Sequence, residues 1–567
     1  MTANGIPGPF KTFTNMITRF SREQVYTLCI GLLAALLFMP FLGGVHLFDW
    51  DEINFAESAR EMIVSRDYLT VQINFIPFRE KPPLFIWMQV ISMKIFGINE
   101  FAARFPNAIC GIVSLLTLFT IGRKIIDVRF ALLWVFLYAG SILPFFYFKS
   151  GIIDPWFNLF IFLGIYQFYL YVSQEKKKLY HSAGSALFIG LAILTKGPVA
   201  FLVFFITAGI FLILKKFKVK FRMSDMLVFV VVLSFTGGFW FILQILEGNF
   251  SIISDFIVYQ IRLFRTRDAG HGGFLLYHFV VLFAGVFPAS VFAIPALFGS
   301  RAETGFNKDF YRWMIILFWV VLLLFTVVKT KIVHYSSLCY FPLTFAAAWS
   351  VYHSGLMTPL RAGILRILAV SMGVMLALVV VGITLIDQYK EFIISRNLIG
   401  DPFAVACLGG SGEWKGYEAF AGIILIAGLT WFSFTWKNRD FDKGIMIVTV
   451  TVSLFMFTAM LLIVPRIEAY SQRPVVEFFK SVNHQDAYLE TIGYKSYAHL
   501  FYGRSRNHVN AQARDENWIL TGNIDKVAYF AVKITGKDKV LQEYPELELL
   551  YEKHGFAFFK RTPLSSK

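Results

Sequence analysis

The chain has 567 residues, of which 57% are hydrophobic, 18% aromatic and only 16% charged. Soluble globular domains carry about 25% charged and about 45–50% apolar residues, so this composition excludes a soluble enzyme, a disordered chain and a fibrous repeat. The formal net charge of +16 is explained by basic cytoplasmic loops rather than by a nucleic-acid partner. We therefore expect a polytopic helical membrane protein.

Apolar runs follow one another along most of the chain. A bilayer core about 30 Å thick is crossed by roughly 20 apolar residues in a helix. Thirteen runs are read as spans, near 27–44, 104–121, 130–148, 153–172, 182–196, 198–214, 226–246, 274–298, 312–328, 336–353, 363–386, 416–436 and 443–464. The fifth and sixth are separated by Gly197 and Pro198, which break a helix.

The charges of the connecting loops orient the chain. The loops 122–129, 173–181 and 215–225 are basic, whereas the segment 45–103 holds eight acidic and five basic residues. Because positive loops stay on the cytoplasmic side, we expect the N-terminus in the cytoplasm and, after an odd number of spans, the C-terminus outside. No small-residue cleavage site follows the first span, which predicts an uncleaved membrane anchor.

Two segments are predicted to lie outside the membrane. The first is 45–103, in which an amphipathic stretch at 52–64 and a short apolar stretch at 83–96 predict helices at the outer interface. The second is 466–567, whose ordinary soluble composition indicates a small α/β domain. It contains one expected helix and three expected strands, at 474–482, 487–492, 527–534 and 556–559.

These segments define the expected architecture. The fold class is an all-α polytopic membrane protein of about 13 transmembrane helices with a small C-terminal α/β extracytoplasmic domain. The transmembrane domain covers 1–465 and the soluble domain covers 466–567.

Ionisable side chains gather on the predicted outer side of the membrane, in loops and at helix ends. Charged groups at the end of a span are costly unless they are paired or solvated, so their concentration on one side indicates a polar cavity open to the outside. The candidates include Asp51, Glu80, Lys81, Asp154, Lys196, Arg262, Arg265, Arg267, His271, Lys331, His334 and Tyr335.

Each candidate also has a structural interpretation. Asp51 and Asp154 precede helical runs and could be helix caps. Lys196 could extend from a helix end to the interface, the stretch 329–335 could be an interfacial anchor, and His271 could be a loop residue.

Taken together, the cations, acids and imidazole suit a phosphate-bearing lipid and a displacement at its attached group. Lysine binds phosphate as a point charge, a carboxylate can act as general base toward an acceptor hydroxyl, and a carboxylate–histidine pair can hold a divalent metal. The sequence has no P-loop and no GxGxxG opening a strand–helix unit, which disfavours an ATP-driven pump.

Five motifs carry a resemblance to a known family. They lie at 51–57, 78–84, 96–104, 194–198 and 329–335. With the number of spans, the orientation and the outer C-terminal domain, they resemble the aminoarabinose transferases of lipid A. More broadly, they resemble the polyprenyl-phosphate-dependent, protein O-mannosyltransferase-like glycosyltransferases of the GT-C superfold.

The resemblance implies a role for most of the candidates. Asp51 is an essential carboxylate and candidate general base, and Asp154 is a second essential acid. Lys81, Lys196 and Tyr335 contact the phosphate of the donor lipid.

The resemblance also implies a metal site and leaves the sugar open. Glu80 and His271 would hold a divalent metal, Zn²⁺ or Mn²⁺. Arg265 or Arg267 replaces an arginine that the family carries after the histidine, and both are assigned to the donor phosphate. Asn54 and Phe78 stand where the family has arginine and tyrosine, so the transferred sugar is not assigned.

The predicted function is that of an inverting membrane glycosyltransferase with a polyprenyl-phosphate-sugar donor and lipid A or another envelope glycolipid as acceptor. We expect a monomer in the bacterial inner membrane, with the active site on the outer face. The first alternative is the same chemistry on a protein serine or threonine. The second is a lipid or sugar transporter, which would carry ionisable groups at the bilayer midplane and internal repeats.

Overall fold

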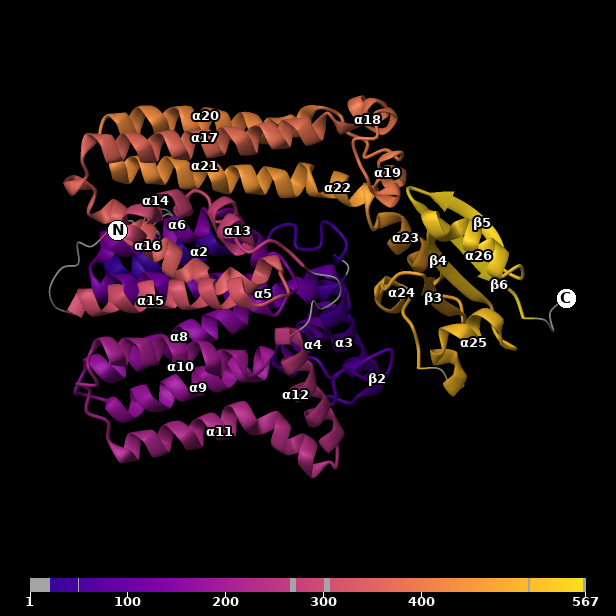
Figure 1. Ribbon diagram of the computed structural model, residues 1–567, viewed down its shortest axis with the longest axis horizontal. Helices are drawn as coiled ribbons and strands as arrows, with labels where there is room; N and C mark the ends of the chain where they lie inside the picture. The colour runs from indigo at the N-terminus through magenta and orange to yellow at the C-terminus, as the bar shows by residue number, and fades with distance from the viewer. Residues whose placement is uncertain (1–20, 49, 266–271, 300–305, 508–509, 564–567) are drawn as a thin grey trace, which may run out of the picture.

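The computed structural model describes residues 21–48, 50–265, 272–299, 306–507 and 510–563. Long helices run side by side along the length of the molecule, and a small sheet-containing domain, yellow in Figure 1, stands at one end of them. We call this end of the helical bundle the domain end. The bundle helices are α2 (Arg22–Phe38), α5 (Glu100–Ile125), α6 (Val128–Ala139), α7 (Ile142–Tyr147), α8 (Asp154–Ser173), α9 (Lys178–Lys196), α10 (Val199–Leu214), α11 (Met223–Leu246), α13 (Tyr277–Gly285), α14 (Ala289–Phe298), α15 (Phe306–Val327), η2 (Val333–Cys339), α16 (Tyr340–Tyr352), η3 (Ser354–Leu356), α17 (Pro359–Thr384), α20 (Phe420–Lys437) and α21 (Phe441–Leu462).

Every expected span coincides with one helix or with two consecutive helices. Among the described residues, seven helices are long and apolar enough to cross a membrane, so the multi-pass membrane fold is confirmed, while the count of thirteen stays a prediction. The expected span 130–148 is divided into α6 and α7 at Gly140. A Cβ atom on Gly140 would lie 2.6 Å from Thr449 Cβ, so glycine here permits the close approach of α6 and α21.

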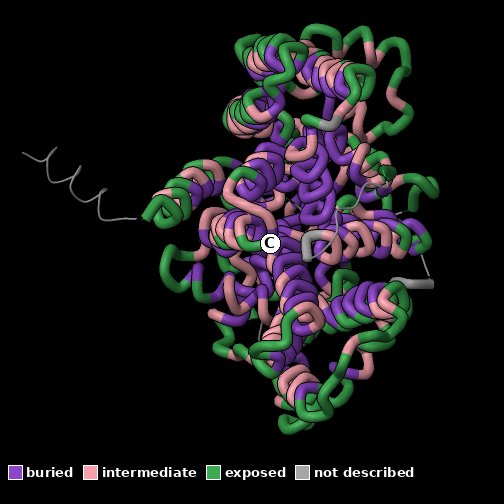
Figure 2. The backbone as a smooth tube through the Cα atoms, turned by 90° about the vertical axis from the view of Figure 1, so that its left-hand side faces the viewer, coloured by how far each residue is buried: buried purple, intermediate pink, exposed green. Residues whose placement is uncertain are grey.

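The core between these helices is rich in aromatic rings. Phe162 of α8 stacks on Phe341 of α16 with ring centroids 4.5 Å apart, and Trp134 of α6 donates its indole N–H to Thr344 Oγ1 at 3.1 Å. Figure 2 shows buried residues in the middle of the molecule and exposed residues around its rim. Large aromatic side chains bury about 150–250 Å² each, so the aromatic content joins the helices to one another as well as facing lipid.

The outer segment forms both expected helices. They are α3 (Asp51–Ser65) and α4 (Leu84–Phe96), joined through the short hairpin β1 (Gln72–Ile73) and β2 (Ile76–Pro77). Residues 52–62 of α3 are all buried, so this helix lies inside the protein and has no lipid-facing side. In contrast, α4 exposes Ile91 and Ile95, as expected of a helix at an apolar interface.

An ion pair fixes the beginning of α3. Arg104 of α5 donates to the two carboxylate oxygens of Glu52 at 3.0 and 2.7 Å and to three backbone carbonyls of residues 42–46. Glu52 also accepts from the backbone N–H groups of Phe48 at 2.8 Å and Gly151 at 2.5 Å. Because both partners are almost fully buried, this network determines where Asp51, the next residue toward the N-terminus, is placed.

The C-terminal domain is built on a four-stranded sheet of order β3-β4-β6-β5, in which β3 and β4 are parallel and the other pairs antiparallel. The expected helix and the three expected strands are confirmed. A fourth strand, β5, has no buried residue, so no alternating apolar pattern marks it in the sequence. The elements are α22 (Val464–Tyr470), α23 (Arg473–Val482), β3 (Tyr488–Ile492), α24 (Ala498–Phe501), η5 (Ala511–Arg514), α25 (Glu516–Thr521), β4 (Ala528–Lys533), η6 (Ile534–Gly536), α26 (Lys537–Glu543), β5 (Glu548–Lys553) and β6 (Phe556–Arg561).

This domain rests on the outer segment. Arg60 of α3 donates to the carbonyl of Ser505 at 2.8 Å, and the Tyr502 hydroxyl accepts from the backbone N–H of Leu47 at 2.6 Å. The domain therefore stands directly beside the beginning of α3. The remaining helices of the domain end are α12 (Phe250–Arg265), α18 (Ile386–Ser395), α19 (Pro402–Leu408) and η4 (Tyr417–Ala419).

Candidate active site

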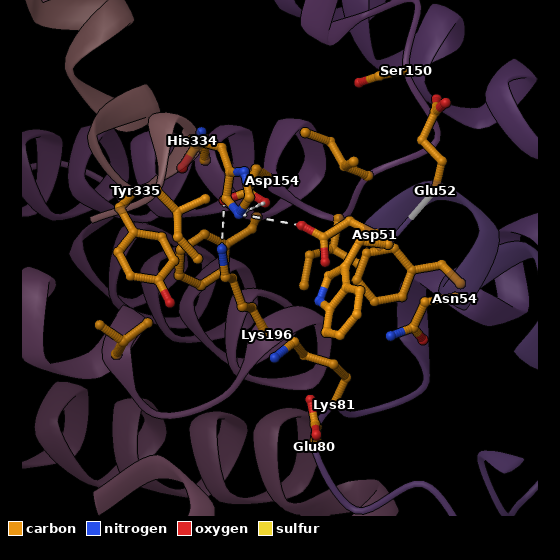
Figure 3. Close-up of a pocket in the computed structure, with 18 of the residues that line it drawn as sticks. Asp51, Glu52, Asn54, Glu80, Lys81, Ser150, Asp154, Lys196, His334 and Tyr335 are labelled. Atoms are coloured by element: carbon orange, nitrogen blue, oxygen red, sulfur yellow. Dashed lines mark hydrogen bonds and ion pairs between the residues drawn. The ribbon is translucent and has the colours of Figure 1, made fainter. Parts of the chain in front are cut away.

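A cavity of about 650 Å³ lies at the domain end of the bundle. Its walls come from the beginnings of α3 and α8, the end of α9, α12, η2, and a short stretch of the C-terminal domain around residue 495. Figure 3 shows that charged side chains from α3, α8, α9, η2 and the segment before α4 converge on one space. Of the residues to which the sequence assigns a role, Asp51, Glu80, Lys81, Asp154, Lys196 and Tyr335 line the cavity, and the further candidates Arg262 and His334 line it as well.

Two aspartates and a histidine meet in this cavity. The Nε2 atom of His334 lies 3.5 Å from Asp51 Oδ2 and 4.0 Å from Asp154 Oδ2. Asp154 is also paired with Lys196, whose Nζ lies 2.5 Å from Asp154 Oδ1. The Asp51 side chain is 34% exposed and that of Asp154 only 5%. Asp154 is thus a buried carboxylate whose charge is balanced by Lys196, while the Asp51 carboxylate faces the cavity.

The helix-cap interpretation does not account for either aspartate. Asp51 and Asp154 are the first helical residues of α3 and α8, one position after the N-caps Trp50 and Ile153, and neither helix has a side-chain cap hydrogen bond. A carboxylate in the first turn is still favoured by the helix dipole. Both aspartates therefore stabilise the helix starts electrostatically, and neither carboxylate is occupied by a cap hydrogen bond: Asp51 faces the cavity, and Asp154 pairs with Lys196.

Cationic side chains surround the same space. Lys81, from the segment between β2 and α4, lies with its Nζ 5.1 Å from the centroid of the Tyr259 ring, and the Arg262 guanidinium lies 5.1 Å from that same centroid. Lys196 lies 5.3 Å from the ring centroid of Tyr335. Burial lowers the pKa of Lys81, Lys196 lowers it further, and Glu80, Asp51 and Asp154 raise it. An anion entering the cavity would favour the charged form of Lys81.

The chain is similar to known proteins in sequence. Residues 80–240 match the family described as dolichyl-phosphate-mannose-protein mannosyltransferase. The chain is 27% identical over 416 residues to an undecaprenyl phosphate-alpha-4-amino-4-deoxy-L-arabinose arabinosyl transferase of Pectobacterium carotovorum, covering 71% of this chain and 72% of the relative. A Yersinia pestis protein of the same description is 28% identical, covering 69% and 70%.

The fold has a solved counterpart. The crystal structure of ArnT from Cupriavidus metallidurans bound to undecaprenyl phosphate superposes with a TM-score of 0.74 at 15% identity, covering 94% of this chain and 98% of that one. Its apo form gives a TM-score of 0.73. The chain is an ArnT-like membrane glycosyltransferase. The resemblance seen in the sequence is thereby confirmed, although the roles of the individual residues remain predictions.

Three residues predicted from the sequence cannot be placed in this cavity. Arg265 is the last residue of α12, but its side chain lies outside the described part of the chain, as do Arg267 and His271. From the same helix, Arg262 lines the cavity, so α12 does present a cation there.

The metal expected between Glu80 and His271 stays a prediction. Glu80 lines the cavity, but His271 is not described, and the described residues include no group of three or more His, Cys, Asp or Glu side chains that could hold a metal ion. The nearby carboxylate of Asp154 is paired with Lys196. Among the described residues, the positive charge that the cavity offers to a phosphate is that of Lys81, Lys196 and Arg262.

Some cavity residues were not assigned a role from the sequence. His334 and Arg262 were visible as polar residues near outer helix ends, and the position of His334 directly before Tyr335 in a family motif was a usable signal. Lys495 and Tyr497, from the C-terminal domain, also line the cavity. No sequence signal connects that domain to residues more than 150 positions earlier.

We expect His334→Gln to lower the rate of glycosyl transfer roughly 10- to 100-fold. Burial lowers the pKa of His334, against the opposing effect of Asp154 and Asp51, so the imidazole is mainly neutral at pH 7 and can orient Asp51 through Nε2–H. A hydrogen bond to a charged group contributes about 1.5–3 kcal/mol, which corresponds to that change in rate. Initial rates with purified protein measure it. His353→Gln, just beyond the other end of α16, is the matched control and should retain the parent rate.

Proposed function

We propose that this chain transfers a sugar from polyprenyl (undecaprenyl) phosphate to lipid A, or to another envelope glycolipid, on the outer face of the bacterial inner membrane. The N-terminus would lie in the cytoplasm and the C-terminal domain in the periplasm, as the loop charges indicate. The observation that carries the proposal is one cavity in which an accessible carboxylate, Asp51, faces the partly buried lysines Lys81 and Lys196. The relatives whose descriptions name an undecaprenyl-phosphate-linked aminoarabinose, and an ArnT structure that holds undecaprenyl phosphate, support it.

The reaction would be a single displacement. Asp51 removes the proton from the acceptor hydroxyl as its oxygen attacks the sugar carbon that carries the phosphate. The bond from that carbon to the phosphate oxygen breaks, and the polyprenyl phosphate leaves with the bonding electron pair. Attack opposite the leaving group inverts the configuration at the sugar carbon. An acceptor oxygen that is already ionised, such as that of a phosphate, would need no proton transfer and would use Asp51 only for orientation.

The cations would act on the leaving group. Negative charge grows on the phosphate oxygen as the bond to the sugar breaks, and donors placed where charge develops lower the barrier. Lys81, Lys196 and Arg262 line the cavity with Asp51. Asp154 holds Lys196 through their ion pair and so sets the position of one of these donors.

A comparison of envelope lipids with and without the protein tests the proposal. Mass spectrometry of lipid A and of envelope glycoproteins from the two strains should show one sugar missing from lipid A, or from another glycolipid, and the mass difference identifies the sugar. A change confined to glycopeptides would overturn the lipid acceptor in favour of a protein acceptor. A build-up of the donor with no acceptor product missing would favour transport without transfer.

We expect Lys81→Ala to weaken the binding of undecaprenyl phosphate about 10- to 100-fold, because one charged hydrogen bond to the phosphate is lost. Titration of the purified protein with the lipid measures the Kd. Lys94→Ala changes a lysine of α4 that lies over the Tyr68 ring outside the cavity, and it should leave the Kd unchanged. Equal binding of undecaprenol and undecaprenyl phosphate by the parent would contradict a charge-based site.

The affinity of this site for undecaprenyl phosphate should depend on pH. Because burial lowers the pKa of Lys81, the empty protein loses this positive charge at a lower pH than an ordinary lysine does. Phosphate binding therefore takes up a proton above that pKa, and affinity should fall as the pH rises through it. Lys81→Arg keeps its charge throughout this range, so the alkaline loss should disappear in that variant.

A further inference from the structure

A second hollow lies beside the active-site cavity. It encloses about 540 Å³ between the β1–β2 hairpin and the C-terminal domain, and we call it the side groove. Its polar lining includes Asn74, Glu490, Lys495, Tyr497, His499 and Glu516. Lys495 and Tyr497 also line the active-site cavity, so the two spaces share a wall.

One wall of the side groove is fixed to the helix that carries Asp51. The backbone N–H groups of Asn74 and Phe75 donate to the two oxygens of Glu61 at 2.7 and 2.8 Å, and Glu61 is fully buried in α3. Both hairpin residues have positive φ, 55° and 54°, an unfavourable conformation for residues other than glycine that needs such support. The groove wall and the candidate base are therefore held by opposite ends of one rigid helix.

The opposite wall holds a buried histidine with an unused nitrogen. His499 is 5% exposed, its Nε2 lies 3.5 Å from Glu490 Oε1, and its Nδ1 has no hydrogen-bond partner within the described residues. With the proton on Nε2, facing the carboxylate, Nδ1 is an acceptor. This nitrogen exposes less than 1 Å², so it lies behind the surface of the groove. What His499 does for the groove is to hold, through its Nε2 contact, the Glu490 carboxylate that lines it.

The lining of the side groove favours a hydroxylated, uncharged ring over an anion. The carboxylates of Glu490 and Glu516 accept hydrogen bonds from hydroxyls and repel phosphate, and burial, followed by Glu490 and Asp515, raises the pKa of Glu516. The aromatic side chain of Tyr497 offers a flat apolar surface. Hydrogen-bond acceptors placed around an aromatic ring are suited to binding a sugar.

The end of the groove next to the active site has the opposite charge. Lys495 lies with its Nζ 4.9 Å from the ring centroid of Trp50 and 5.4 Å from that of Tyr497. Trp50 directly precedes Asp51 in the chain. An anionic substituent on a sugar in the groove would meet Lys495 at the point where the groove joins the cavity, next to the candidate base.

We infer that the side groove binds the saccharide headgroup of the acceptor, with Lys495 holding an anionic substituent of that headgroup at the entrance to the active site. This rests on the proposed function, since it assigns the acceptor side of the same reaction. The C-terminal domain would then select the acceptor, while the membrane-embedded part of the cavity binds the donor. The ligand class is a phosphorylated oligosaccharide.

The probe for this inference is fully deacylated lipid A, which is a phosphorylated glucosamine disaccharide, titrated into the purified full chain. Glu490→Gln keeps the size of the side chain and should weaken binding about tenfold, as expected for the loss of one charged hydrogen bond. Lys495→Ala should weaken binding of the phosphorylated disaccharide about tenfold and leave the dephosphorylated form unaffected. Glu543→Gln, on the exposed part of α26, is the matched control and should bind like the parent.

Two further measurements separate this inference from a folding defect. Undecaprenyl phosphate should bind equally well to the parent and to Glu490→Gln, since the donor cavity is intact. The midpoint of thermal unfolding should also be unchanged. Weaker disaccharide binding with normal donor binding supports an acceptor groove.

Several outcomes overturn the inference. Failure of the parent to bind the disaccharide, or equal binding by the parent and the groove variants, removes the acceptor groove. So does a result in which these variants weaken only the binding of a serine- and threonine-containing peptide. The proposed function is judged separately: sugar transfer to lipid A with unchanged disaccharide binding leaves that function standing, whereas disaccharide binding at the groove without transfer by the parent rejects it and keeps the groove.

Discussion

Replacing Asp51 by asparagine is expected to slow sugar transfer by about 10²- to 10⁴-fold, the usual contribution of a general base. Asparagine has nearly the same size and also tolerates a helix start, but its amide cannot take a proton. Asp51 is the more exposed of the two cavity aspartates, so the change should affect the chemical step and not the packing. Single-turnover transfer from donor to acceptor measures it.

The control for Asp51→Asn is the same substitution at a true helix cap. Asp127 caps α6 by accepting from the backbone N–H of Phe130 at 2.8 Å, and asparagine should replace it with little effect on transfer. Thermal unfolding and donor binding of Asp51→Asn should match those of the parent. Full activity in Asp51→Asn would leave Asp51 with an electrostatic role at the helix start and would move the search for a base to His334.

The largest loss of stability is expected from Arg104→Gln, at about 3–5 kcal/mol. The substitution leaves the buried Glu52 without its partner cation, and it removes the donor to three backbone carbonyls. Both partners are less than 5% exposed, so water cannot replace the lost contacts. A lower midpoint of thermal unfolding in detergent measures the effect, and activity should fall with it because the same network positions Asp51.

The matched control is Arg129→Gln, which also removes an arginine from a bidentate pair. Arg129 donates to Asp442 at 2.6 and 2.9 Å, but the two side chains are 49% and 44% exposed, so the expected cost is at most about 1 kcal/mol. Adding Glu52→Gln to Arg104→Gln should recover part of the loss, since no uncompensated charge remains. Equal destabilisation by the two arginine variants would show that burial of the Arg104 pair is not what matters.

Much of the fold could be predicted because it depends on local pattern. Each expected span matches one or two helices, since about 20 apolar residues in sequence have few stable structures other than a helix in a bilayer. The expected strands in the C-terminal domain also form. The strand that was missed, β5, is exposed along its whole length and so has no alternating apolar pattern to reveal it.

The candidate site was predictable only in part. Asp51, Lys81, Asp154 and Tyr335 fall in motifs that resemble a known family, and they do line one cavity. Neither periodicity nor spacing identifies them as site residues, because an aspartate at the start of a helix can equally well be a helix cap. The structure separates the two interpretations by placing Trp50 and Ile153 at the cap positions.

The sequence by itself determined that this protein is a helical membrane protein with a small α/β domain at its C-terminus, because composition and hydrophobic periodicity report directly on the solvent that each segment meets. Only the tertiary structure decided which charged residues meet. It buries α3 between the bundle and the C-terminal domain, sets His334 near both aspartates, and brings Lys495 to the same cavity. These contacts join residues up to about 450 positions apart in the chain, and such contacts arise from the packing of whole elements, which no local pattern encodes.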